Sequence, residues 1–178
     1  MQSVDSLELR CLRSEAEVHA ARPLEEAGYS AEEGASLESM LYRYRNARRL
    51  FLGAFDSTGA IVGYIMSTQG AAPLVTHASM EEHDPQGTTV CIHSVCVKES
   101  WQRKGVALKL LQAYTELVRG YNAADRKEAG GPRLRRLAML SRKNLVPLYT
   151  RAGYSVLGES DVVHGTETWY DCVLDLEN

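Results

Sequence analysis

The sequence lacks a surplus of basic residues. Its 20 Lys and Arg stand against 23 Asp and Glu, which gives a formal net charge of −3 at pH 7. A protein that binds nucleic acid usually carries a basic excess, so we expect no nucleic-acid partner. We interpret the local basic clusters as solvated faces of the molecule; their members are Arg43, Arg45, Arg48 and Arg49, then Arg133, Arg135 and Arg136.

Long apolar runs are also missing. No stretch reaches the roughly 18 consecutive apolar residues that a membrane-spanning helix needs, so we expect no membrane partner. The first six residues are polar and acidic, with neither the apolar core of a signal peptide nor the Arg-rich pattern of a transit peptide. The sequence therefore predicts a cytoplasmic protein.

The cysteines are few and scattered. Of the four, Cys11, Cys91, Cys96 and Cys172, only Cys91 and Cys96 are near neighbours, and their spacing is not that of a CxxC zinc or redox motif. All four lie in apolar, strand-like contexts, which is typical of buried free thiols in a reducing compartment. We expect no metal site.

What is present is the composition of one globular domain. A chain of 178 residues can bury a sizeable core, and its 44% hydrophobic and 24% charged residues are ordinary for a soluble protein. There are no internal repeats and no low-complexity tract. We expect residues 1–178 to form a single domain that is a monomer or a weak dimer.

The most informative stretch is residues 89–118. An apolar, β-branched run predicts a strand over 89–97, and a short polar loop with Gly105 follows it. Apolar residues then recur with a helical period: Ala107, Leu110, Leu111, Tyr114, Leu117 and Val118.

A strand, a basic loop with a glycine and the start of a helix together suggest an anion site. The first turn of a helix offers unpaired N–H groups, and Gly105 lets the backbone approach a phosphate closely. The alternative is an ordinary strand–helix turn with solvated basic residues, and spacing alone does not decide between the two.

The first half of the chain reads as strand, two helices and a hairpin. A strand is predicted over 7–12, and a helix from the capping box of Ser14 and Glu17 to Gly28, kinked or split at Pro23. Ser30 and Glu33 predict the start of a second helix that ends near residue 46. Strands follow over 49–55 and 61–67, then a long loop over 68–87 with one helical turn.

After the central helix we expect a polar loop over 121–132 and a strand over 134–140. Asn144 is predicted to cap a short helix that has Pro147 in its first turn and Gly153 at its end. Strands over 154–157 and 168–174 complete the chain. Composition and periodicity alone give an α/β protein with a mixed sheet.

Two motifs carry a resemblance to a known family. The pattern Gln102-x-x-Gly105-x-Ala107 and the block Asn144-Leu-Val-Pro-Leu-Tyr149-x-x-x-Gly153-Tyr154 resemble the GNAT acyltransferases. The resemblance implies the GNAT fold, an α/β (α+β) domain with a mixed, mostly antiparallel sheet of about seven strands flanked by about four helices. It also implies acetyl-CoA as cosubstrate, without a metal.

Further segments are similar to one branch, the arylalkylamine (serotonin) N-acetyltransferases. They are Pro73-Leu-x-Thr-His77, Cys91-Ile-His93-Ser-Val-Cys-Val97, the Asn144 block and His164-Gly-Thr-Glu-Thr-Trp-Tyr170. This branch implies Tyr149 as the acid that protonates the CoA thiolate, and Val95 as the residue whose N–H polarises the thioester carbonyl. The alternative for Tyr149 is a core aromatic residue. The residues implied to bind the cosubstrate are Val95, Cys96, Val97, Gln102, Arg103, Lys104, Gly105, Val106, Ala107, Leu108, Asn144 and Tyr149.

His93 is the candidate base. An alkylamine with a pKa of about 10 is neutral in only about one molecule in a thousand at pH 7, and histidine is the usual remedy. Strand alternation predicts that His93 shares a face with Cys91 and Val95. Vertebrate enzymes of the branch carry a His-x-His pair here; Cys91 replaces the first, which implies a one-histidine relay completed by water. The alternative is a buried core histidine.

We expect substrate recognition from residues 24–41, 68–87 and 158–169. The candidates for contacts with a cationic amine or its neighbourhood are Glu32, Glu33, Cys91, His164 and Glu167. The branch members that prefer indole-ethylamines carry a Cys-Pro-Leu element in the first segment, and its absence leaves polyamines open as well as arylalkylamines. The chain has no long tails, so we expect no phosphorylation switch of the kind that the vertebrate enzymes carry.

The predicted function is acetyl-CoA-dependent N-acetylation of a small arylalkylamine or polyamine, by direct transfer in a ternary complex. One alternative is a protein or peptide N-acetyltransferase, which would need an open groove. Another is an acyl-CoA-binding module without catalysis, which would need neither His93 nor Tyr149.

Overall fold

One twisted seven-stranded sheet runs through the molecule. The structure, a computed structural model, describes residues 2–125 and 131–176. The strands are β1 (Glu8–Cys11), β2 (Phe51–Phe55), β3 (Ile61–Gly70), β4 (Thr89–Val97), β5 (Arg136–Arg142), β6 (Ser155–Glu159) and β7 (Trp169–Asp175), in the order β1-β2-β3-β4-β5-β7-β6. Only β4 and β5 pair in parallel, so the prediction of a mixed, mostly antiparallel sheet of seven strands is confirmed.

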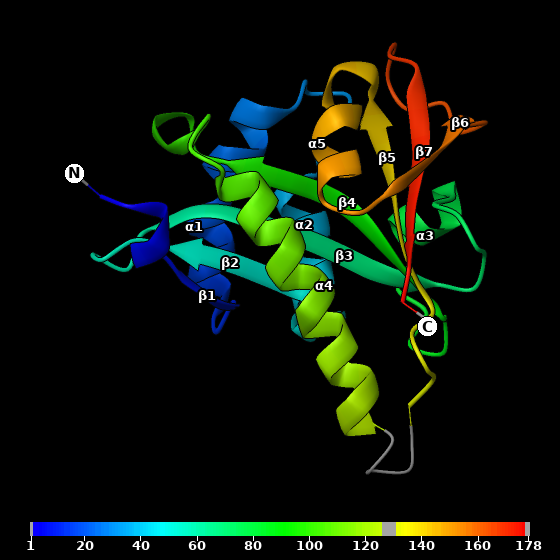
Figure 1. Cartoon of the computed structure of the whole chain (residues 1–178), viewed down its shortest axis with the longest axis horizontal. Helices are drawn as coiled ribbons and strands as arrows, with labels where there is room; N and C mark the ends of the chain where they lie inside the picture. Colours follow the sequence, from blue (N-terminus) through cyan, green and yellow to red (C-terminus); the bar gives the residue numbers. More distant parts are fainter. Residues whose placement is uncertain (1, 126–130, 177–178) are drawn as a thin grey trace.

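Helices cover both faces of this sheet (Figure 1). They are α1 (Glu15–Gly28), α2 (Leu37–Asn46), α3 (His77–Glu81), α4 (Val106–Asp125) and α5 (Val146–Arg151). Helices α4 and α5 pack on one face, and α1 and α2 on the other. The short α3 is the helical turn predicted within the long loop, and it brings the number of α-helices in the described part of the chain to five, against the expected four or so.

Each face has its own apolar core. On the α4 face, Leu110, Leu111 and Tyr114 are fully buried against strand residues such as Ile65 and Ile92. On the other face, Val18 of α1 and Met40 of α2 pack on Tyr64 and Met66 of β3. Successive side chains of β3 point to opposite faces of the sheet, so the strand contributes to both cores. Burial of these side chains stabilises the packing of the helices on each face.

The sheet opens at its centre. Strands β4 and β5 pair only where residues 89–92 lie beside residues 136–139. Beyond Ile92 the two strands diverge, as the V between them in Figure 1 shows. Among the described strands, none pairs with the second half of β4 on that side, so its backbone can bind groups other than a strand.

Two predicted helix starts are wrong. Residues 31–34 form a turn, and α2 begins only at Leu37, because the Ser36 hydroxyl accepts the Ser39 N–H at 3.1 Å and caps the helix there. Asn144 does not cap α5; it lies in a 3-10 turn, and no side chain caps that helix. Pro147 does occupy its first turn, as predicted.

Other boundaries differ in smaller ways. Ser14 caps α1 through the Glu17 N–H as predicted, and the helix continues through Pro23 without a break. The helix α4 runs to Asp125, and the rest of the expected 121–132 loop includes residues 126–130, which lie outside the described residues. Within the described chain, no helix combines the length and the apolar character needed to cross a bilayer.

Candidate active site

The loop that precedes α4 presents open backbone. Gly105 has φ 85° and its carbonyl accepts the N–H of Lys109 at 3.1 Å, so α4 starts at this glycine. A Cβ at Gly105 would meet no atom within 4 Å. The first N–H groups of an α-helix have no partner within the helix, so those at the start of α4 are available to a ligand. The residues fit an acidic group such as a pyrophosphate.

The side chains of this loop are exposed and partly engaged. Gln102 donates to the Val97 carbonyl at 3.0 Å and ties the loop to the end of β4. The Lys104 ammonium lies 5.4 Å from the centre of the Trp101 ring, and Arg103 has φ 60°. Left-handed backbone at a residue other than glycine is uncommon and is found at ligand-binding loops.

Two tyrosines lie where β4 and β5 diverge. The N–H of Val95 donates a long hydrogen bond, 3.4 Å, to the hydroxyl of Tyr29 from the end of α1. Tyr149 of α5 is buried, and its ring lies edge-on to Tyr154 at 6.1 Å. Burial raises the pKa of Tyr149 above its usual range, so its hydroxyl keeps its proton at neutral pH.

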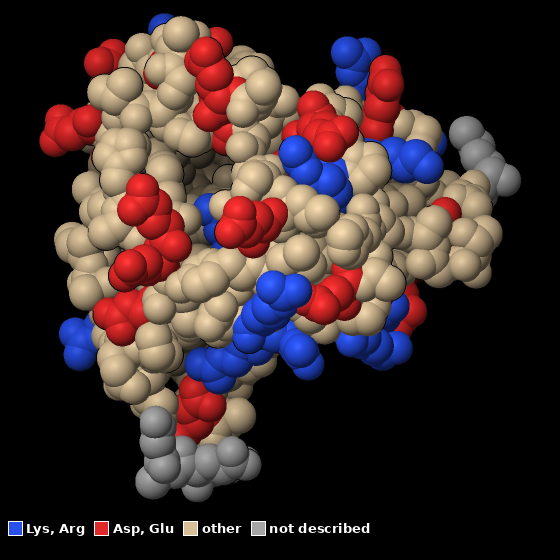
Figure 2. Space-filling model, turned by 180° about the vertical axis from the view of Figure 1, so that it is seen from behind, with Lys and Arg blue, Asp and Glu red and all other residues tan. Residues whose placement is uncertain are grey.

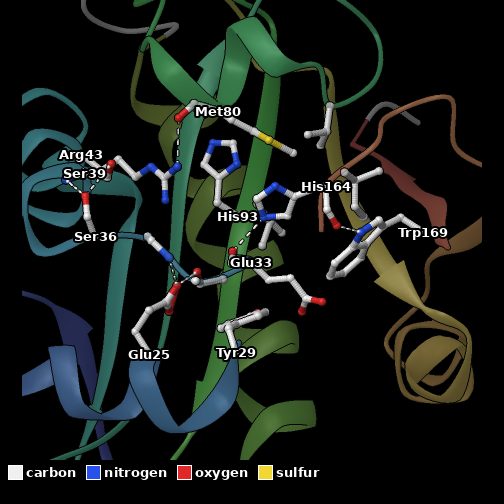
Figure 3. Close-up of a pocket in the computed structure, with 16 residues that line it drawn as sticks. Glu25, Tyr29, Glu33, Ser36, Ser39, Arg43, Met80, His93, His164 and Trp169 are labelled. Atoms are coloured by element: carbon white, nitrogen blue, oxygen red, sulfur yellow. Dashed lines mark hydrogen bonds between the residues drawn. The ribbon is translucent and has the colours of Figure 1, made fainter. Parts of the chain in front are cut away.

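A cavity of about 330 Å³ lies behind this point, on the face that α1, α2 and α3 cover. The three segments expected to recognise substrate all contribute to its wall (Figure 3). Its lining residues are Glu25, Tyr29, Glu33, Gly34, Ala35, Ser36, Ser39, Arg43, Val75, Met80, Ile92, His93, Ser94, Leu140, His164 and Trp169.

A β-bulge displays His93 in this cavity. The register of β3 with β4 shifts, since Met66 pairs with Ser94 and the next residue, Ser67, pairs with Ile92. His93 is the extra residue, and a bulge re-aims the side chain at that position. Its ring lies between Arg43 and His164 in Figure 3.

The prediction that Val95 shares a face of the strand with Cys91 is wrong. Cys91 packs with Val75 on the α3 side, whereas Val95 packs in the core of the α4 face. The extra residue shifts the two-residue period, so Val95 does not share a face with Cys91. Cys91 is fully buried, does not line the cavity, and has a pKa raised to about 11 by burial.

Hydrogen bonds fix the tautomer of His93. The Thr68 hydroxyl donates to the Ser79 carbonyl at 2.6 Å, and the same oxygen lies 2.7 Å from Nε2 of His93. Because Thr68 has one hydroxyl hydrogen, Nε2 of His93 is the donor, which leaves Nδ1 with a free lone pair. Burial, and secondarily the charge of Arg43, lowers the pKa of His93 well below 6.5, so the ring is neutral.

Glu25 joins α1 to the strand. It is 1% exposed, and its carboxylate accepts the Ser94 hydroxyl at 2.6 Å and the Ala35 N–H at 3.3 Å. The Tyr64 hydroxyl and the Cys96 thiol donate to its second oxygen. These contacts place a carboxylate in the cavity wall beside the bulge, and they hold the α1–α2 connection against β4.

The α1–α2 connection also bridges the cavity mouth. The Glu33 carboxylate pairs with Arg142 of β5, and the Glu33 carbonyl lies 2.8 Å from Nε2 of His164. Trp169 donates from Nε1 to the His164 carbonyl at 2.6 Å. Of the predicted substrate contacts, Glu33 and His164 therefore reach the cavity, whereas Glu32 and Glu167 are exposed and do not line it. Figure 2 shows this face hollowed, with acidic side chains around the opening.

Sequence reasoning missed several residues of this wall. Arg43 was interpreted as a solvated residue, but only 6% of it is exposed. Its spacing of three residues from Met40 placed it on the apolar face of α2, and this signal could have identified it. The same signal, four residues after Ala21, marks Glu25 as an inward residue of α1.

Among residues 2–125 and 131–176, no three His, Cys, Asp or Glu side chains lie close enough together to hold a metal ion. The groups that the structure does bring together are a neutral histidine, a buried carboxylate, a buried guanidinium and a protonated tyrosine near an open strand edge. Such a set can accept one proton and donate another around a bound electrophile.

Comparisons with known proteins show which family the chain resembles. The sequence profile of the acetyltransferase (GNAT) family matches residues 18–154. Serotonin N-acetyltransferase of Mesocricetus auratus is 25% identical over 122 residues, which are 68% of this chain and 54% of that protein. The chain thus spans about half the length of this relative.

Two solved structures share the fold. The GphF GNAT-like decarboxylase in complex with isobutyryl-CoA superposes with a TM-score of 0.75 at 16% identity, covering 96% of this chain and 100% of that one. A phosphinothricin acetyltransferase from Sinorhizobium meliloti in complex with AcCoA gives a TM-score of 0.65 at 13% identity, covering 96% and 88%.

Proposed function

The chain belongs to the acetyltransferase (GNAT) family, a family of acyltransferases, and on that premise we propose that it acetylates the primary amine of a small acceptor of arylalkylamine or polyamine type. Acetyl-CoA supplies the acetyl group, and transfer is direct in a ternary complex. The observation that carries the proposal is the neutral His93 in a small cavity, beside the point where β4 and β5 diverge and Tyr149 lies.

Different groups of the chain bind the pyrophosphate and the thioester of acetyl-CoA. The amides at the start of α4, from Gly105 to Leu108, hold the pyrophosphate of the cosubstrate, and Gln102, Arg103 and Lys104 surround it. The N–H of Val95 donates to the thioester oxygen, which takes the place of the Tyr29 hydroxyl. Cys96, Val97 and Asn144 complete the predicted contact set.

Two proton transfers accompany the acetyl transfer. The amine nitrogen attacks the thioester carbon and the carbon–sulfur bond breaks. Nδ1 of His93 accepts the proton that the amine loses, directly or through one water, because Nε2 is engaged with Thr68. The hydroxyl of Tyr149 gives a proton to the departing thiolate, and its raised pKa keeps that proton in place until then.

The narrowed mouth favours a small acceptor over a protein. Glu33 ties the α1–α2 connection to Arg142 and His164 across part of the cavity mouth, and this narrowing favours a small molecule over an extended peptide. A module that only bound acyl-CoA would need neither a half-buried neutral histidine in the acceptor cavity nor a buried tyrosine. We propose the cytoplasm as its compartment, since all four cysteines are free thiols.

The test is turnover of acetyl-CoA against a panel of acceptors, followed as release of free thiol. The panel contains tryptamine, serotonin, phenethylamine, spermidine, putrescine and a lysine peptide. Faster thiol release with one or more small amines, matched by an equal amount of N-acetylated product, supports the proposal. Acetylation of the peptide alone would make it a protein acetyltransferase, and binding of acetyl-CoA without any turnover would make it a binding module.

A further inference from the structure

Arg43 is a buried cation inside the acceptor cavity. It extends from α2 into the cavity wall and is 6% exposed. Its Nη2 donates to the Met80 carbonyl at 2.9 Å, and its Nη1 lies 3.9 Å from the sulfur of Met66. Figure 3 shows the guanidinium directed toward His93 and the space around it.

The protein satisfies only some of the hydrogen-bond donors of this guanidinium. It carries five N–H donors, and one carbonyl and one thioether satisfy only part of them. Among the residues that the structure describes, no carboxylate forms an ion pair with it within 4.0 Å; burial lowers its pKa, and the charge of Glu25 at longer range offsets this only in part. A buried cation without an ion pair destabilises a protein, whereas an anion bound to it would be held by charge-assisted hydrogen bonds.

A second donor lies one turn away on the same helix face. The Ser36 hydroxyl accepts the Ser39 N–H at 3.1 Å and donates to the Ser39 hydroxyl oxygen at 3.1 Å. The Ser39 hydroxyl hydrogen therefore remains free to donate into the cavity that both serines line. Ser39 precedes Arg43 by four residues, so the two side chains share one face of α2.

The opposite end of the cavity carries the opposite charge. The Glu25 carboxylate accepts the Ser94 hydroxyl at 2.6 Å, and Ser94 is adjacent to Val95, where the thioester oxygen is proposed to bind. Glu25, Arg43 and His93 line the same cavity, and in Figure 3 the Arg43 guanidinium lies beside the His93 ring, with Glu25 below both. The cavity thus offers an anionic group from α1, next to the strand residue Ser94, and a cationic group from α2, next to His93.

Aromatic side chains form a third wall. The His164 ring lies 5.9 Å from the Trp169 ring, and both line the cavity together with Leu140. Trp169 is 6% exposed and is fixed by its hydrogen bond to the His164 carbonyl. A rigid aromatic wall suits an aromatic or apolar group of a ligand.

We propose that the acceptor is an aromatic amino acid, that is, an arylalkylamine that also carries a carboxylate. The carboxylate binds Arg43 and Ser39, the amine lies between Glu25 and His93, and the aromatic group packs on Trp169. This inference rests on the proposed amine acetylation. It disfavours polyamines, because their second ammonium would meet the Arg43 guanidinium.

Matched pairs of acceptors that differ only in the carboxylate test this inference. The pairs are phenylalanine with phenethylamine and tryptophan with tryptamine, and spermidine represents the polyamines. We expect kcat/KM for the amino acid of each pair to exceed that for the plain amine by about tenfold or more, as for other hydrogen bonds to charged groups. Equal or higher kcat/KM for the plain amines or spermidine would overturn the inference and leave the amine acetyltransferase standing. No turnover with any of the five, with acetyl-CoA bound, would overturn both.

Variants locate the carboxylate. In Arg43→Met the ratio of kcat/KM for the amino acid to kcat/KM for the plain amine should fall to about one, whatever the change in the absolute rates. Arg43→Lys should give an intermediate preference, because an ammonium keeps the charge but loses the fork of donors. Ser39→Ala should lower the preference less than Arg43→Met. A full preference retained in Arg43→Met would overturn the inference.

A measurement on the unmodified protein covers the case in which Arg43→Met does not fold. We expect 3-phenylpropionate to inhibit acetylation of phenethylamine competitively, and 3-phenylpropanol, which lacks the charge, to inhibit at least about tenfold more weakly. Equal inhibition by the two compounds would overturn the inference.

Discussion

The backbone N–H of Val95 donates to the hydroxyl of Tyr29 across a distance of 3.4 Å. Val95 lies on the part of β4 that β5 has left, and Tyr29 follows the last turn of α1. The donor proposed for the thioester oxygen is thus occupied by a side chain of the acceptor cavity. Binding of the cosubstrate at Val95 would therefore displace the hydroxyl of Tyr29, a residue that lines the acceptor cavity.

Tyr29→Phe should tighten the binding of acetyl-CoA. The substitution removes the hydroxyl that the thioester must displace, and a weak hydrogen bond of this kind is equivalent to roughly twofold to tenfold in affinity. Calorimetric titration of both proteins with acetyl-CoA measures the change. Weaker binding together with a lower kcat would instead mean that the Tyr29 hydroxyl itself contacts the thioester.

Tyr149→Phe should lower kcat by about 100-fold, in the range of general acid catalysis, and leave the KM for acetyl-CoA nearly unchanged. Tyr154→Phe is the matched control, because its ring packs against Tyr149 and its buried hydroxyl has no hydrogen-bond partner among the described residues. Removing an unpaired hydroxyl should leave activity intact and leave the free energy of unfolding equal or about 1 kcal/mol higher. Equal losses of kcat in the two variants would contradict the assigned role.

Gly105→Ala should raise the KM for acetyl-CoA about tenfold. Gly105 has φ 85° and Gly59 has φ 84°, and a Cβ would meet nothing within 4 Å at either position. Left-handed backbone costs a residue with a side chain about 1–2 kcal/mol, so both Ala variants should lose similar stability in urea denaturation. Only the Gly105 variant should change the KM, because only there does a phosphate approach the backbone. An equal KM for acetyl-CoA in both variants would contradict the assignment of the phosphate site to this loop.

The lowered pKa of His93 makes stability depend on pH. Below its ordinary pKa of 6.5 the unfolded chain takes up a proton at this residue, whereas the buried ring in the folded protein stays neutral to lower pH. This contribution to stability is therefore complete above pH 6.5 and is lost as the pH falls below that value. In urea denaturation at pH 7 and pH 5.5, His93→Gln should lose less stability on acidification than the unsubstituted protein. His77→Gln, on exposed α3 surface, should lose as much as the unsubstituted protein. The same acid loss in all three would contradict the assignment.

The sequence predicted elements whose signals are local. The strand over residues 89–97 and the Ser14 cap match the structure, because an apolar run between polar breaks and a serine three residues before a glutamate suffice to specify them. The start of α2 was not predictable in this way. Ser30 carried the capping signal, but the residues after it form a turn that Glu25 contacts at Ala35 and that Glu33 ties to Arg142, and Ser36 caps the helix instead.

The site was predictable in part for the same reason. The motifs identified His93, Val95, Tyr149 and Gly105 as candidate site residues. The order of strand, loop and helix also placed Val95 and Gly105 close together at the end of β4. The face of Val95 could not be predicted, because the bulge at His93 arises from pairing with β3, 25 residues away from it in sequence at the Thr68 contact. Arg43 shows the opposite case: its position on the apolar face of α2 was visible, but its charge led to the wrong interpretation.

The most direct test is the activity of His93→Gln with acetyl-CoA and a small amine. We predict a loss of kcat/KM for the amine by a factor of about 10² to 10⁴, with an unchanged Kd for acetyl-CoA, because the variant keeps the cosubstrate site but loses the base. His77→Gln should keep full activity. Turnover of His93→Gln within twofold of the unsubstituted protein would contradict the account, since the bulge would then display a histidine without a role in proton transfer.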